Sequence, residues 1–269
     1  MYRIGIDLGG TNIAVGVVDD RHRIVAEASV PTGAFRPVEE MLADMCRAVE
    51  MALDKAGLMA ADCASIGIGS PGTCDSEAGV VVRAYNLGWF NVPVCQMLHE
   101  HFGIPVRLSN DANCAALAEI VAGAAVGYQD MVLITLGTGV GGGIIIDGKI
   151  YAGMRSMGAE LGHTLLVLEG EHCTCGRDGC WEAYASATAL IRQAKRAGEQ
   201  HPDSALHGRE ELTARGGVLA DEADAMSVLE AASQDSTFWS AVYNNTEKTV
   251  DIAIHGEYDT VYSYSLADW

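Results

Sequence analysis

One short pattern occurs twice in this sequence, and the repetition limits the folds that the chain can adopt. Residues 2–18 read YRIGIDLGGTNIAVGVV and residues 131–146 read MVLITLGTGVGGGIII, so that Leu8 and Leu136 stand at equivalent places. Each copy is a β-rich run, a glycine-rich turn and a second β-rich run, which predicts an antiparallel strand pair. Two copies of one supersecondary unit predict a duplicated protein with two lobes and a cleft between them.

The residues after the first copy alternate between strand and helix patterns. Residues 37–57 carry apolar residues at helical spacing, begin with proline and two glutamates and end at Gly57, which predicts a helix. A buried strand that runs into a Pro-Gly turn is expected over residues 63–73, and a helix, a strand and a capped helix over residues 91–125. This order predicts an α/β fold in which a β-meander precedes βα units.

The domain organisation follows from where the second copy begins. We expect a first lobe over residues 1–118 and a second over residues 119–233, with a helix that ends at Gly198 and another over residues 222–233. Residues 234–269 change character, because aromatic and β-branched residues surround a turn-like NNTEK. We therefore expect a β-rich tail there.

The charge of the chain restricts its partners. It carries 36 acidic and 17 basic residues, a formal net charge of −19, which repels nucleic-acid backbones and argues against a nucleic-acid partner. No apolar run approaches the roughly 18 to 20 residues of a membrane span. The first residues do not form a signal-peptide pattern, so we expect a cytoplasmic protein without a membrane partner.

Glycines at the tips of the two turns predict phosphate binding. Glycine lets a backbone approach a ligand closely and turn its N–H groups toward an anion. Neither turn is a Walker A loop, since no Gly-Lys-Ser/Thr follows, and a plain tight turn is the alternative for either copy alone. The residues concerned are Gly9, Gly10, Thr11 and Asn12 in the first copy and Gly137, Thr138 and Gly139 in the second.

Carboxylates stand beside these turns. Asp7 ends a strand that we expect to be buried on both faces, where a carboxylate is costly unless it is paired or binds a metal. A water-mediated hold on Mg²⁺ would explain it, and a carboxylate that caps the turn is the alternative. Asn110 and Asp111 follow a predicted strand and begin a predicted helix. Asp111 is placed to accept the proton of a substrate hydroxyl, the alternative being an ordinary N-cap.

Three of the eight cysteines are clustered in EHCTCGRDGCWE. Together with His163 they form a Cys₃His set that suits tetrahedral zinc, and four protein ligands make such a site structural. Redox-active or incidental cysteines are the alternative. The clustered residues are Cys173, Cys175 and Cys180, whereas Cys46, Cys63, Cys74, Cys95 and Cys114 stand singly among apolar neighbours, as small buried hydrophobic residues do.

Two carboxylate residues lie close in the sequence to the predicted zinc ligands. Glu160 precedes His163 by three residues, and Glu182 follows Cys180 by two. One metal would therefore fix both carboxylates at a common place. Carboxylate oxygens accept hydrogen bonds from sugar hydroxyls, so this pair is typical of polyol recognition.

Seven motifs occur in the order and spacing of a known family. They are DLGGTN, GIGSPGT, NLGW, NDAN, LGTGVGGG, GAELGH and CTCGRDGCWE. Over residues 1 to about 233 the chain resembles the ROK family of bacterial sugar kinases and repressors. The resemblance implies the two-lobed actin-like (ribonuclease H-like) ATPase fold, and transfer of the γ-phosphate of MgATP to the 6-hydroxyl of a hexose.

The resemblance also implies roles for individual residues. Asp111 matches the catalytic base of the family, and the turns at residues 9–11 and 137–139 match its phosphate-binding segments. His163 matches a residue that both contacts the sugar and binds zinc. The sugar contacts that the resemblance implies are Gly72, Asn86, Asn110, Glu160, His163 and Glu182.

The substrate is expected to be glucose, because AYNLGWFNVPV is most similar to the glucokinase branch. Mannose, fructose, allose or an N-acetylhexosamine is the alternative. A sugar-responsive repressor is less favoured, since the repressors carry a helix-turn-helix before the first strand, which is expected here from Tyr2. A homodimer is expected if the second lobe is intact.

The resemblance ends near residue 233. Family members generally continue with a helix, an adenosine-binding strand and turn, and a last helix, whereas this tail weakly resembles the terminal strands of linear amide hydrolases. Without an adenosine-binding segment the affinity for nucleotide is expected to fall. A catalytically impaired sugar-binding protein is therefore a further alternative.

Overall fold

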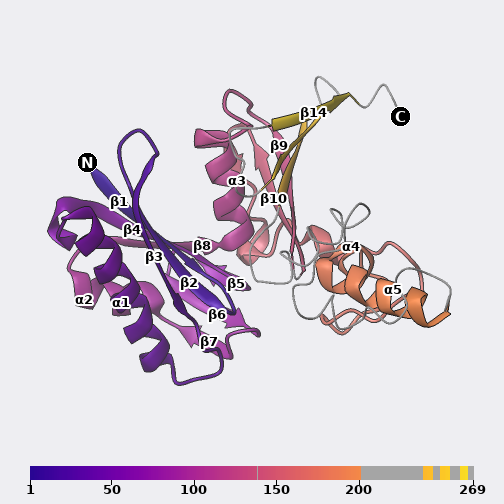
Figure 1. Cartoon of the computed structure of the whole chain (residues 1–269), viewed down its shortest axis with the longest axis horizontal. Helices are drawn as coiled ribbons and strands as arrows, with labels where there is room; N and C mark the ends of the chain where they lie inside the picture. The colour runs from indigo at the N-terminus through magenta and orange to yellow at the C-terminus, as the bar shows by residue number, and fades with distance from the viewer. Residues whose placement is uncertain (138, 201–238, 245–248, 255–260, 266–269) are drawn as a thin grey trace. The chain divides into compact units, whose positions relative to one another are not determined.

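The computed structural model describes residues 1–137, 139–200, 239–244, 249–254 and 261–265 (Figure 1). They form two compact units. Unit 1 comprises Met1–Gly123 and Ile150–Gly158. Unit 2 comprises Ala124–Lys149 and the described residues from Ala159 onward.

Unit 1 is built on a five-stranded sheet with the order β3-β2-β1-β4-β8. The first three strands form an antiparallel meander, whereas β4 and β8 run parallel to β1. A three-stranded antiparallel sheet, β5-β6-β7, follows β4 in the chain. The strands are β1 (Tyr2–Leu8), β2 (Asn12–Val18), β3 (Ile24–Pro31), β4 (Cys63–Ser70), β5 (Thr73–Asp75), β6 (Val80–Ala84), β7 (Trp89–Val92) and β8 (Val106–Asn110).

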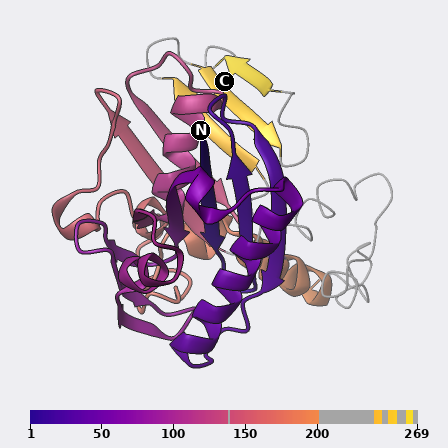
Figure 2. The ribbon, with the colours of Figure 1, turned by 90° about the vertical axis from the view of Figure 1, so that its left-hand side faces the viewer.

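Helix α1 (Val38–Ala56) covers one face of this sheet, and in Figure 2 it lies in front of the indigo strands. It begins after Pro37 and ends at Gly57, whose φ of 66° is left-handed, so the predicted helix is confirmed. Its buried side chains share the core of the sheet. The 3₁₀ turn η1 (Ala60–Asp62) and helices α2 (Val94–Phe102) and α3 (Asp111–Ala122) complete the main segment of unit 1.

Strand β1 is buried on one face only. The side chains of Ile4, Ile6 and Leu8 are at most 3% exposed, whereas Asp7 is exposed. Successive side chains of a strand point to opposite faces, so Asp7 lies on the face away from this core. The expectation that β1 is buried on both faces was therefore wrong, and burial does not explain the carboxylate.

Unit 2 repeats the meander of unit 1. Its sheet has the order β11-β10-β9-β12-β13-β14. Leu136 pairs with Val140 across the second turn as Leu8 pairs with Ile13 across the first. The strands are β9 (Met131–Leu136), β10 (Val140–Ile146), β11 (Lys149–Ile150), β12 (Trp239–Asn244), β13 (Thr249–Ile254) and β14 (Val261–Ser265).

The sheets differ in the strand beside the meander, because β12 runs antiparallel to β9 whereas β4 runs parallel to β1. Strands β12, β13 and β14 belong to the segment for which strands were expected. The predicted helix over residues 222–233 and most of the NNTEK turn lie outside the described residues.

Two 3₁₀ turns and two α-helices follow β11 in the described part of the chain. They are η2 (Met154–Ser156), η3 (Leu161–His163), α4 (Glu182–Ala185) and α5 (Ala187–Gln200). Helix α5 continues through Gly198, so the predicted end was two residues short; a glycine inside a helix costs only about 1 kcal/mol. Within the described part of the chain, no helix has the length and apolar character needed to cross a membrane.

Candidate functional site

Three parallel strands of unit 1 end at one edge of its sheet. Asp7 in β1 pairs with Gly69 in β4, and Gly69 pairs with Ser109 in β8. Sheets of this kind bind ligands beyond the carboxyl ends of their strands. The structure thus brings together at one edge the following predicted site residues of unit 1: Asp7, Gly9, Gly10, Thr11, Asn12, Gly72, Asn110 and Asp111.

The first glycine turn is tight and lies against Asn86. The Gly9 N–H donates to the Asn12 carbonyl oxygen at 2.9 Å. A Cβ atom on Gly9 would stand 2.8 Å from the same oxygen, so glycine is required there. A Cβ atom on Gly10 would stand 3.4 Å from Asn86 Nδ2. Asn86, a predicted sugar contact, therefore borders the predicted phosphate turn.

Asn110 is the N-cap of helix α3. Its Oδ1 accepts the Asn113 N–H at 3.2 Å, and its Nδ2 donates to the Gly72 carbonyl oxygen at 3.2 Å. The N-cap of this helix is therefore Asn110, and not Asp111, for which the N-cap alternative was raised. Because the Asn110 side chain accepts one hydrogen bond and donates another, it connects the start of α3 to the turn that follows β4.

Asp111 is the first residue of α3 and its side chain is exposed. Its Oδ1 accepts the Ala112 N–H at 2.8 Å. Burial raises the pKa of the nearby Cys114 thiol, and together with the negative charges of Asp111 and Asp7 it brings that pKa to about 11. Since both carboxylates act on one thiol, they concentrate negative charge at this edge of the sheet. Such a place attracts a divalent cation.

Gly72 occupies a backbone position that only glycine fits. Its φ is +79°, and a Cβ atom would run into the carbonyl oxygen of Arg83 in β6. We expect Gly72→Ala to lower the free energy of unfolding by about 1–3 kcal/mol, as strained backbone positions do. Gly57→Ala is the matched control, since Gly57 has a φ of +66° but no atom within 4 Å of its Cβ position.

Urea unfolding of the two variants measures the difference. A left-handed alanine in open space costs about 1 kcal/mol, so the Gly57 variant should lose less stability than the Gly72 variant. Equal losses would show that the Arg83 carbonyl does not constrain the turn.

The second glycine turn, in unit 2, is held by Glu182. The Gly137 N–H donates to the Gly139 carbonyl oxygen at 3.0 Å, and the Val140 N–H donates to Glu182 Oε2 at 3.0 Å. The other carboxylate oxygen, Oε1, accepts from Thr174 Oγ1 at 3.4 Å. Glu182 thus connects the turn to the cysteine-rich loop, residues 173–180. Thr138 lies outside the described residues.

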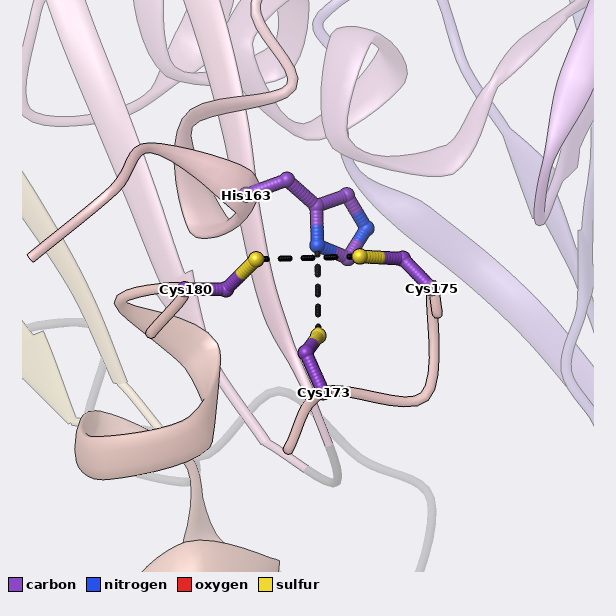
Figure 3. A group of neighbouring side chains, drawn as sticks. All are labelled: His163, Cys173, Cys175 and Cys180. Carbon is purple, nitrogen blue, oxygen red and sulfur yellow. Dashed lines mark hydrogen bonds between the residues drawn. The ribbon is translucent and has the colours of Figure 1, made fainter. Parts of the chain in front are cut away.

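The predicted metal ligands converge in unit 2 (Figure 3). The ligand atoms of His163, Cys173, Cys175 and Cys180 all lie within 4.8 Å of one another. The sulfurs of Cys175 and Cys180 are 3.6 Å apart, and Cys173 Sγ is 3.7 Å from His163 Nδ1. Two thiolates on one tetrahedral zinc ion, each at about 2.3 Å, stand about 3.8 Å apart. The spacing therefore fits a Cys₃His zinc site.

The surroundings act in opposite directions on two of the predicted thiol ligands, and Arg177 favours the thiolate at one of them. Burial raises the pKa of Cys173 to about 12. At Cys175 burial also acts to raise the pKa, but hydrogen bonds from the backbone and side chain of Arg177 lower it to about 7. Arg177 Nη2 also donates to the His163 carbonyl oxygen at 2.7 Å. The guanidinium offsets the single negative charge that Zn²⁺ with three thiolates would carry.

Glu160 is exposed and directly precedes η3 (Leu161–His163), where its carbonyl oxygen accepts the His163 N–H at 3.1 Å. The backbone therefore joins it to a predicted zinc ligand. The joint contact of Glu160 and Glu182 with a sugar stays a prediction.

Sequence reasoning missed two residues, one in the loop of the clustered cysteines and one beside the first glycine turn. Arg177 stands between two predicted ligands in CGRDGC, and its charge beside thiolates was a usable signal. Thr32 is buried and bonds to Gly9, 23 residues away in the chain. Nothing in the local sequence indicates that contact, because it depends on the pairing of β1, β2 and β3.

Comparison with known proteins identifies the family. A sequence model of the ROK family matches residues 3–254, so the match extends beyond residue 233, where the resemblance was expected to end. The glucokinase of Streptomyces coelicolor is 38% identical over 231 residues, 86% of this chain and 69% of that protein. The N-acetylmannosamine kinase of Citrobacter koseri is 36% identical over 196 residues, 72% of this chain and 65% of that protein.

A solved structure agrees. The ROK family glucokinase from Streptomyces griseus, in complex with glucose and AMPPNP, superposes with a TM-score of 0.69 at 36% identity, over 86% of this chain and 74% of that one. The expected actin-like ATPase fold of the ROK sugar kinases is thereby confirmed. With a family match over most of its length, this chain belongs to the ROK family.

Proposed function

We propose that the chain is an ATP-dependent kinase that transfers the γ-phosphate to the 6-hydroxyl of glucose. The observation that carries the proposal is the edge of the unit 1 sheet, where a carboxylate at the start of a helix lies at the same end of the strands as a glycine turn. The similarity to glucokinases supports glucose as the sugar.

Asp111 is proposed as the base that takes the proton of the sugar hydroxyl. Phosphoryl transfer needs one group to orient and deprotonate the hydroxyl, and donors that neutralise the phosphate. The N-terminus of α3 stabilises the Asp111 carboxylate, and the Asn110 cap fixes where that helix begins. Asn86, Asn110 and Gly72 are the proposed sugar contacts of this unit.

The glycine turns at residues 9–12 and 137–139 are proposed to bind the phosphates of ATP. Their N–H groups are donors of the kind that cradle an anion. Asp7 is exposed near Asp111, and its carboxylate oxygens suit Mg²⁺, which this residue would hold through water. When bound, Mg²⁺ neutralises phosphate charge.

Zinc is proposed as a structural ion in unit 2. The ligand atoms of Cys173, Cys175, Cys180 and His163 lie close together, and these four residues would fill a tetrahedral shell and leave no position for a reacting water. The ion would hold the loop that carries Glu182, which in turn accepts the Val140 N–H beside the second glycine turn. Sugar contacts of Glu160, His163 and Glu182 are part of the proposal.

A kinase for an N-acetylhexosamine is the second candidate, because an N-acetylmannosamine kinase is nearly as similar as the glucokinases. The test is a coupled assay of ADP formation with reduced protein, MgATP and a panel of glucose, mannose, fructose, allose and N-acetylmannosamine. We expect the highest kcat/KM with glucose. A preference for the acetylated sugar would favour the second candidate, and binding without turnover would favour a sugar-responsive regulator.

Cytoplasmic location is part of the proposal, since cysteines that bind zinc or lie buried as single thiols suit a reducing compartment. A sugar, rather than nucleic acid, is the proposed partner. The homodimer stays a prediction.

A further inference from the structure

One buried threonine bonds to both ends of the first glycine turn. Thr32 directly follows β3 and is 0% exposed. Its hydroxyl donates to the Gly9 carbonyl oxygen at 2.7 Å, and its N–H donates to the Thr11 carbonyl oxygen at 2.7 Å. Two carbonyl groups of the turn are therefore fixed by one residue.

The direction of those carbonyl groups decides where the N–H groups point. A trans peptide group is planar, with its C=O and N–H on opposite sides. The carbonyl of Gly9 shares a peptide group with the N–H of Gly10, and the carbonyl of Thr11 shares one with the N–H of Asn12. The described backbone contains no cis peptide. Thr32 therefore turns the N–H groups of Gly10 and Asn12 away from itself.

An arginine connects Thr32 to helix α1. Arg36 Nη2 donates to the Thr32 carbonyl oxygen at 2.7 Å and bonds to Asp44 Oδ2 in α1 at 2.6 Å. Arg36 Nε donates to the Gly33 carbonyl oxygen at 2.8 Å. The Asp44 side chain is only 15% exposed, so this ion pair is anchored on the helix that covers the sheet.

Residues 32–36 also contact the segment that carries Asn86, which borders the turn at Gly10. The Phe35 N–H donates to the Leu87 carbonyl oxygen at 3.2 Å, and a Cβ atom on Gly88 would stand 3.0 Å from Phe35 Cδ1. Leu87 follows Asn86, whose amide borders Gly10. Residues 32–36 thus contact the glycine turn and the segment that carries Asn86.

We propose that Thr32 is a positioning residue for nucleotide binding, with Arg36 and Asp44 holding it in place. It aims the N–H groups of the first glycine turn at the phosphates of the nucleotide without touching the nucleotide. The proposal rests on the proposed kinase function. It explains why a polar side chain is fully buried at the end of β3.

The test compares Thr32→Val with Thr32→Ser. Valine keeps the volume and removes the hydroxyl, whereas serine keeps the hydroxyl. We expect Thr32→Val to raise the KM for ATP and the Kd for MgADP about tenfold, the effect of one lost buried hydrogen bond. The KM for glucose should stay within about twofold, and Thr32→Ser should restore most of the ATP affinity.

Two measurements do not need turnover. Isothermal titration with MgADP gives nucleotide affinity, and hydrogen exchange of peptides that cover residues 8–13 reports the order of the turn. If Thr32→Val weakens MgADP and speeds exchange while the wild type phosphorylates no sugar, the kinase proposal fails and the positioning role stands. Unchanged MgADP affinity and exchange in the valine variant would overturn the positioning role.

A second variant, at a partly exposed residue, keeps the proposal testable if Thr32→Val does not fold. Arg36 is partly exposed, and Arg36→Gln removes its ion pair with Asp44 while leaving the Thr32 hydroxyl in place. If Thr32→Val does not fold, Arg36→Gln decides: a rise of about threefold in the Kd for MgADP with the KM for glucose unchanged supports the proposal. An unchanged Kd contradicts it.

Discussion

Asp111→Asn is expected to reduce kcat for glucose phosphorylation by a factor of about 10³ while leaving the Kd for glucose within about threefold. Asparagine has the same shape and keeps an oxygen that can accept the Ala112 N–H, so the start of α3 should be preserved. It cannot take the proton of the sugar hydroxyl. The loss should therefore appear in kcat, measured by the coupled assay, with binding followed by titration.

The control for this variant is Glu119→Gln, which makes the same chemical change on the same helix, away from its first turn. It should keep kcat within about twofold. If Asp111→Asn turns over like the wild type, Asp111 is not the base, and the proposed mechanism must be abandoned even if the protein is a kinase.

Removal of zinc should have the second largest effect. Chelation, or Cys180→Ser, is expected to lower the thermal midpoint by about 10 °C and to weaken glucose binding at the same time. The reason is that Glu182 joins the cysteine-rich loop to the second glycine turn, with contacts to Thr174 and Val140. Metal analysis, a thermal scan and glucose titration of reduced protein measure the three quantities.

Cys95→Ser provides the comparison, because Cys95 is a half-buried thiol of unit 1 outside the cluster. This variant should bind one zinc ion per chain as the wild type does. A freshly prepared, reduced protein without zinc would exclude the metal site, and a chelated protein with unchanged midpoint and sugar affinity would show that the ion does not support the turn.

Local patterns in the sequence were enough for much of the fold. The proline, the acidic first turn and Gly57 mark helix α1 because caps and helix ends depend on neighbouring residues. The repeated strand pair was visible because both copies keep their glycines. The three cysteines and His163 were found together because metal ligands are chemically distinctive and most are close in the chain.

Features that depend on tertiary contacts were missed. The exposure of Asp7 depends on which face of β1 the helix α1 covers, and periodicity in a short apolar strand does not settle that. The bonds of Thr32 and Glu182 join segments far apart in sequence. The direction of β12 is likewise set by its partner strand β9, because an isolated strand pattern carries no direction.

The direction of β12 has a consequence for the symmetry of ligand recognition. At the edge of the sheet that carries Gly9, the strands β1, β4 and β8 all end, and β8 is followed directly by helix α3. At the edge that carries Gly137, β9 ends whereas β12 begins, since Trp239, the first residue of β12, pairs with Leu136, the last residue of β9. The duplicated halves therefore present opposite backbone polarity next to matching glycine turns. A ligand group that is recognised by the strand ends beside the first turn therefore meets different backbone groups beside the second.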